Sequence, residues 1–111
     1  MVRYVQKGEA VDYRPAEAVA AGDVVIQGSL VGVARLDIAP GTLGALAVVG
    51  VFDAPKTFGE IAVGTPLYWD AENKQATVTQ SGKPYFGKAV AFAGDNDEVV
   101  RFLLNAPDVA V

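Results

Sequence analysis

The sequence contains neither cysteine nor histidine. The lack of cysteine excludes disulfides and thiolate chemistry, and the two absences together exclude zinc or copper sites built on these side chains. Without an imidazole there is also no base of that kind to activate Ser29 or Ser81, which stand beside glycines in expected turns. We therefore expect no catalytic residues, no cofactor and no metal, and we do not expect an enzyme.

Charge is also scarce, at 20% of the residues, and the formal net charge is −4. The nine basic residues are scattered, whereas nucleic-acid binding depends on basic patches. The longest uncharged stretch, residues 38–52, is too short and too often broken by glycine and proline to span a bilayer. The first residues start no apolar signal-peptide core. We expect a soluble protein, made without an export signal, that binds neither nucleic acid nor membranes.

What the sequence does contain is hydrophobic residues, which make up 51% of its 111 positions. A chain of this length forms one domain and can bury a real core. The small share of charged residues leaves little polar surface for so small a body. Part of the apolar surface is therefore expected to face a partner or a sister subunit.

Three segments share one pattern: a β-branched residue, Ala, a variable residue, Gly, and then Asp or Thr. They are residues 19–23, 38–42 and 61–65. In the middle copy Pro40 and Gly41 suit the two central positions of a type II turn, where the second requires a positive φ. The pattern predicts three sharp chain reversals, each leading into a strand. Their unequal spacing argues against a solenoid.

Short apolar runs separated by turn residues predict about nine strands and little helix. The fold class is all-β, a compact sandwich or barrel whose strands are joined by glycine-mediated turns. Residues 15–21 form at most a short helical turn. Residues 43–52 are apolar at both odd and even positions, so a strand here would carry apolar side chains on both faces. This predicts a strand that is covered on both faces. The expected strands are residues 4–6, 10–13, 23–26, 30–34, 43–52, 67–69, 76–79, 85–93 and 98–104.

Two of these strands resemble each other. Leu30–Ala34 and Tyr85–Ala89 share the order apolar, apolar, Gly, any residue, Ala, and each follows one of the glycine turns. The pattern suggests an internal duplication with an extra hairpin at residues 70–74. A chance likeness between two short glycine-containing strands is the alternative.

We expect three segments along the chain: an N-terminal arm or edge strand over residues 1–15, a β-rich body over 16–105 and a C-terminal tail over 106–111. The first segment is polar and aromatic, and could add a strand to the sheet edge of a neighbour. An edge strand of its own domain is the slightly favoured interpretation. The candidate partner-binding residues are Tyr4, Gln6, Tyr13, Arg14 and Trp69.

Two motifs suggest chemistry that their details do not support. Residues 50–57 match a phosphate-binding loop except that Pro55 replaces the second glycine, and proline has no N–H to offer a phosphate. The end of a strand followed by a turn is the better interpretation. Residues 95–98 are acidic, but the Gly and Glu that a calcium-binding loop requires are missing. A turn between two strands is expected there.

The ordered set of short motifs resembles a family of capsid cement, or head decoration, proteins of tailed bacteriophages and prophages. The resemblance extends from about Tyr4 to Asn105. The motifs that carry it are Tyr4–Gly8, Val11–Pro15, Ala20–Val25, Leu30–Ala34, Gly50–Lys56 and Leu67–Asp70.

The resemblance implies a structural virion protein that binds the outside of an assembled phage capsid and stabilises it. Its partner would be the major capsid protein, and it would be made in the cytoplasm of the bacterial host. A homo-oligomer is expected, a trimer in preference to a dimer. The alternative functions are a virion-surface module that binds a host glycan through Trp69 or Tyr68 and, less favoured, a nucleotide-binding protein that uses residues 50–57.

Overall fold

The computed structural model describes residues 2–3, 8–56 and 59–107. It confirms the all-β prediction, since the described residues form nine strands and no helix, residues 15–21 included. Hence none of the described residues belongs to a helix long and apolar enough to cross a membrane. The strands are β1 (Ala10–Tyr13), β2 (Val24–Gln27), β3 (Leu30–Ala34), β4 (Gly44–Ala47), β5 (Val51–Pro55), β6 (Pro66–Asp70), β7 (Gln75–Thr77), β8 (Tyr85–Ala89) and β9 (Val99–Leu104).

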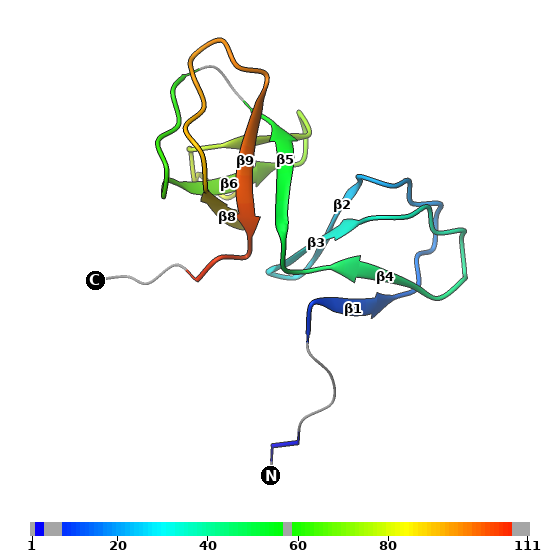
Figure 1. Cartoon of the computed structure of the whole chain (residues 1–111). Coiled ribbons are helices and arrows are strands. Elements are labelled where there is room, and N and C mark those ends of the chain that lie inside the picture. Colours follow the sequence, from blue (N-terminus) through cyan, green and yellow to red (C-terminus); the bar gives the residue numbers. More distant parts are fainter. Residues whose placement is uncertain (1, 4–7, 57–58, 108–111) are drawn as a thin grey trace.

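The strands form two antiparallel sheets that follow one another along the chain (Figure 1). The first has the order β1-β4-β3-β2 and the second the order β5-β9-β8-β6-β7. When β7 is omitted and the strands of each half are numbered along the chain, both sheets have the same spatial order: first, fourth, third, second. The two halves are therefore two versions of one four-stranded unit, and the β6–β7 hairpin is an addition to the second version.

The backbone hydrogen bonds outside the strands repeat in the same way. An isolated antiparallel bridge joins Val19 to Ile38 in the first unit and Ile61 to Ala93 in the second. Just after each bridge a glycine N–H donates to the end of the third strand: Gly22 to the Ala34 carbonyl at 2.6 Å, and Gly64 to the Ala89 carbonyl at 2.7 Å. This agreement favours the internal duplication over a chance likeness.

The three glycine turns form as predicted. Gly22, Gly41 and Gly64 have φ values of 93°, 75° and 87°. In each turn the N–H of the residue after the glycine donates to the carbonyl three positions earlier, over 3.0 to 3.2 Å. A positive φ at the third position together with this hydrogen bond is the signature of a type II turn, where glycine is needed because it has no Cβ.

The shared glycine of the third strand has a packing role in both units. A Cβ on Gly32 would lie 2.9 Å from the Cβ of Leu46 on β4, and a Cβ on Gly87 would lie 2.2 Å from the Leu103 carbonyl oxygen on β9. The third strand therefore approaches the fourth too closely for any side chain at this position. The close approach explains the repeated glycine that the sequence shows.

The prediction of one strand over residues 43–52 is wrong. The segment is split between β4 and β5, and Gly50 at the break has a φ of 139°, which only glycine adopts easily. The expected cover on both faces holds for residues 46–48, which are all buried, but not at the ends of the segment, where Leu43 and Val51 are more than half exposed. The chain changes from one sheet to the other at this point, so the apolar run belongs to two strands with different neighbours.

The main hydrophobic core lies inside the second sheet, which curls into a small barrel. A parallel bridge between Lys56 and Ala76 joins the ends of β5 and β7, the two outer strands of this sheet. The rings of Phe86 and Phe102 stack in the core with centroids 4.2 Å apart. Val31 and Val33 of β3 belong to the same core, so one face of the first sheet packs against the barrel. A smaller cluster of Ala34, Ile38 and Leu46 lies elsewhere on the first unit.

Candidate functional site

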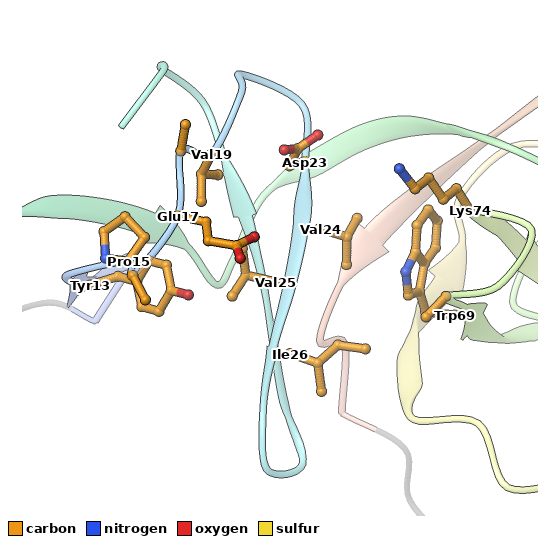
Figure 2. A pocket seen from close by; sticks show the side chains of 13 residues that line it. Tyr13, Pro15, Glu17, Val19, Asp23, Val24, Val25, Ile26, Trp69 and Lys74 are labelled. Atoms are coloured by element: carbon orange, nitrogen blue, oxygen red, sulfur yellow. The ribbon is translucent and has the colours of Figure 1, made fainter. Parts of the chain in front are cut away.

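A groove of about 550 Å³ runs along β2, the outer strand of the first sheet. We call it the β2 groove. Figure 2 shows Tyr13 and Pro15 on one side of β2 and Trp69 with Lys74 on the other. The structure thus brings two of the five predicted partner-binding residues, Tyr13 and Trp69, to a single groove, although they are distant in sequence.

Trp69 contributes only its rim to this groove, because the side chain is 7% exposed. Its ring packs on Phe86 with a centroid distance of 4.9 Å and belongs to the barrel core. Tyr13 is half-buried and packs against the smaller cluster of the first unit. Both residues therefore have structural roles, and their contact with a partner stays a prediction.

The other predicted residues lie away from this groove or outside the described residues. The Arg14 side chain is exposed, and its Nη1 donates to the Gly41 carbonyl at 2.6 Å. The Gly41 N–H in turn donates to the Pro15 carbonyl at 2.8 Å. Arg14 thereby ties the end of β1 to the second glycine turn. Tyr4 and Gln6 lie outside the described residues.

A second groove, of about 910 Å³, lies where β4 leads into β5. We call it the apolar groove, because four exposed aliphatic side chains line it: Leu36, Leu43, Val49 and Val51. Leu36 is 78% exposed and Leu43 is 60% exposed. Apolar patches of this kind on a small protein mark interaction surfaces. Sequence reasoning missed these residues: Leu43, Val49 and Val51 lie in an apolar run that was expected to be covered on both faces, and Leu36 lies outside it.

Two carboxylates among the described residues make close contacts with neighbouring side chains. Arg101 on β9 makes two hydrogen bonds to the carboxylate of Asp53 on β5, of 2.9 and 3.2 Å. This pairing holds the pKa of Asp53 below its ordinary value and raises that of Arg101. The pKa of Asp70 is also lowered, chiefly because the Asn73 side-chain amide donates to its carboxylate at 2.9 Å.

Neither of the two motifs that suggested chemistry forms a site in the described part of the chain. Residues 51–55 are strand β5, as the strand-end interpretation predicted, and the Lys56 Nζ is turned to the Gly59 carbonyl at 2.9 Å. In the acidic segment Asp95 and Asp97 accept hydrogen bonds from the N–H groups of Gly59 and Gly94. Within residues 2–3, 8–56 and 59–107 no three acidic side chains are grouped so that they could hold a metal.

Comparison with known proteins gives one positive finding. The model of the phage cement protein family matches residues 5–104, which is nearly the whole chain. Neither the curated proteins nor the solved structures show a significant match. The matched span contains both four-stranded units and both grooves, so the family assignment applies to the whole described fold. The chain belongs to the phage cement protein family.

Proposed function

We propose that this chain binds the outside of an assembled phage capsid and stabilises the shell. It acts as a small homo-oligomer, a trimer in preference to a dimer, and contacts the major capsid protein. Two observations carry the proposal: the chain belongs to the phage cement protein family, and its apolar groove is lined by four exposed aliphatic side chains, Leu36, Leu43, Val49 and Val51.

The physical basis is burial of apolar surface on a rigid scaffold. Removing apolar surface from water contributes about 25 cal/mol per Å², so a patch of four aliphatic side chains adds a modest gain at each site. A ligand that binds only the assembled shell stabilises it by mass action, and many copies across subunit junctions multiply the effect. The net charge of −4 keeps an outer protein from attraction to the DNA inside.

The N-terminal segment supplies the second contact. In this proposal the residues from Tyr4 to Arg14 reach a capsid subunit or a sister chain. The support is that this segment precedes and includes β1, one of the two outer strands of the first sheet. Val2 is fully exposed.

The test uses purified protein and mature heads that lack it. The unmodified chain is expected to cosediment with the heads and to raise their resistance to heat. Leu43→Asp places a charge in the apolar groove and is expected to weaken cosedimentation at least tenfold. Val63→Asp is the matched control, since Val63 is also exposed but lies away from this groove. If the unmodified chain does not cosediment, or if heads with and without it resist heat equally, the proposal is wrong.

A further inference from the structure

The two units differ at one sheet edge. In the second unit the outer edge of β6 is covered by β7, through the pairs Tyr68–Thr77, Trp69–Ala76 and Asp70–Gln75. The counterpart of β6 in the first unit is β2. Among the described residues β2 pairs only with β3, so its outer edge has no partner strand. The first unit therefore lacks the strand that completes the second.

The backbone of β2 is oriented to accept such a strand. The Ala34 N–H donates to the Asp23 carbonyl at 2.9 Å, which makes Asp23 and Ala34 a hydrogen-bonded position of the β2–β3 pair. Hydrogen bonds alternate along an antiparallel pair, so the N–H and carbonyl groups of Val24 and Ile26 point away from β3. These groups face the β2 groove, which Val24 and Ile26 help to line.

The two faces of the β2 edge differ in character. On one face lie Val24 and Ile26, which point toward Trp69 in Figure 2. The side chains of Asp23 and Val25 alternate with those of Val24 and Ile26, so they lie on the other face of the strand. Glu17 lies on the same side as Val25. An incoming strand therefore meets Val24, Ile26 and the Trp69 edge on one side, with Lys74 beside them. On the other side it meets Val25, Glu17 and Asp23, whose carboxylate also accepts a hydrogen bond from the Ala20 N–H at 2.9 Å. The matching strand has apolar residues at one parity and cations at the other.

The N-terminal segment of this chain has that pattern. Residues 2–7 read Val-Arg-Tyr-Val-Gln-Lys and contain two cations and no acid. In an extended segment Val2, Tyr4 and Gln6 share one face, and Arg3, Val5 and Lys7 share the other. Val2 and Tyr4 suit the face of Val24 and Ile26, and Arg3 and Lys7 suit the face of Glu17 and Asp23. Both charge and apolar character are complementary.

The segment cannot reach this groove in its own chain. The Val48 N–H donates to the Glu9 carbonyl at 3.0 Å, so the chain is still beside β4 at Glu9. β1 and β2 are three strand spacings apart, about 14 Å. Crossing that distance uses about four extended residues of the segment, which leaves too few to pair. The occupant must come from a second copy.

We infer that residues 2–7 of one copy add a strand to the outer edge of β2 of the next copy. This strand would cover the edge of the first unit in the way that β7 of the same chain covers the edge of β6 in the second unit. This contact joins two different surfaces, so it is head-to-tail and closes into a ring when the rotation permits. The inference rests on the proposed homo-oligomer, but it requires no capsid for its test.

Disulfide trapping between two variants of the full-length chain tests the contact directly. Because the chain has no cysteine, Tyr4→Cys and Ile26→Cys each introduce a single thiol. When the two variants are mixed and oxidised, a disulfide between them can form only between copies. We expect the yield of disulfide-linked dimer from the mixture to be at least fivefold higher than the yield from either variant oxidised alone. Val63→Cys in place of Ile26→Cys is the matched control.

Two results would overturn the inference: a mixed dimer no more abundant than the control, or Ile26→Cys dimers in excess, which would indicate that two β2 edges pair with each other. A charge swap gives a second measurement. Lys7→Glu and Glu17→Lys are each expected to shift the chain toward the 11.6-kDa monomer in sedimentation equilibrium, and mixing the two variants is expected to restore the oligomer. Glu60→Lys is the control for Glu17→Lys.

These measurements separate the inference from the proposed function. If trapping succeeds and the oligomer does not bind heads, the contact between copies stands and the capsid proposal is wrong. If heads are bound and stabilised but trapping gives no mixed dimer, the cement function stands and the strand exchange is wrong.

Discussion

The side-chain amide of Asn105 donates a 2.8 Å hydrogen bond to the carbonyl oxygen of Val31, and so joins the end of the second unit to the third strand of the first. The same nitrogen donates to the Val48 carbonyl, also at 2.8 Å. Asn105 has a φ of 53°, a conformation that Asn tolerates better than most residues. One side chain therefore links the two units at two points.

Asn105→Gly is expected to lower the free energy of unfolding by about 1–3 kcal/mol, because two backbone carbonyls lose their donor while the positive φ stays unstrained. Asn105→Asp is expected to be worse, since it places carboxylate oxygens against two carbonyls. Urea unfolding of both variants measures the effect. An Asn105→Gly variant as stable as the parent would show that the link does not hold the units together.

Gly87→Ala is expected to destabilise the protein by about 4 kcal/mol or more, because its Cβ would overlap the Leu103 carbonyl oxygen, a backbone atom. Gly32→Ala is expected to cost less, about 1–3 kcal/mol, because its Cβ would lie 2.9 Å from the Leu46 Cβ, a smaller overlap than the 2.2 Å at Gly87. Gly8→Ala is a control with a positive φ and open space around the new methyl group. Thermal unfolding would rank the three variants, and a Gly87→Ala variant no worse than Gly8→Ala would contradict the close approach.

Trp69→Ala is expected to cost about 3–5 kcal/mol of stability, because the ring fills the barrel core against Phe86. Trp69→Phe keeps an aromatic ring in place and is expected to lose less. A glycan array with the unmodified chain and the Trp69→Phe variant tests the glycan-binding alternative. Binding by the unmodified chain that Trp69→Phe removes without loss of stability would favour that alternative over a structural role.

The β6–β7 turn is expected to make stability depend on pH. The pKa of Asp70 is lower in the folded chain than its ordinary value of 3.8, chiefly through the Asn73 side-chain hydrogen bond. The unfolded chain therefore binds a proton more readily, so the contribution of Asp70 is present above about pH 5 and is lost as the pH falls through the folded value. Asn73→Ala is expected to raise the pKa of Asp70 toward 3.8 and to weaken this dependence.

An NMR titration of the Asp70 carboxyl in both proteins measures the shift directly. Asn96→Ala, in the exposed turn before β9, is the matched control, and its Asp70 is expected to titrate as in the parent. The account of the turn fails if Asn73→Ala leaves the pKa of Asp70 unchanged.

Local signals predicted the parts of the fold that local physics determines. The three glycine turns depend on a positive φ at one position, and the β2–β3 hairpin on Gly28, so both were predictable from short sequence patterns. The division of residues 43–52 was not, because apolar residues continue across Gly50 and only the three-dimensional neighbours show where the sheet changes. The parallel bridge between Lys56 and Ala76 is a long-range contact with no sequence signature.

The candidate site was predictable only in part, for the same reason. Tyr13 and Trp69 were identified as aromatic residues suited to a partner, but their meeting at the β2 groove depends on how the two units pack. Leu36 and Leu43 were not identified, since an isolated leucine in a sequence gives no sign of whether it lies in a core or on a surface.

The position of β9 determines the order in which the chain can fold during synthesis. β9 lies between β5 and β8, so the barrel cannot form until Val99–Leu104 has been made. The first unit consists of four consecutive strands and can pair while the rest is still being translated. The barrel core and the Asn105 link therefore form after all four strands of the first unit have been made. Synthesis itself therefore separates the two similar units into an early-folding half and a late-folding half.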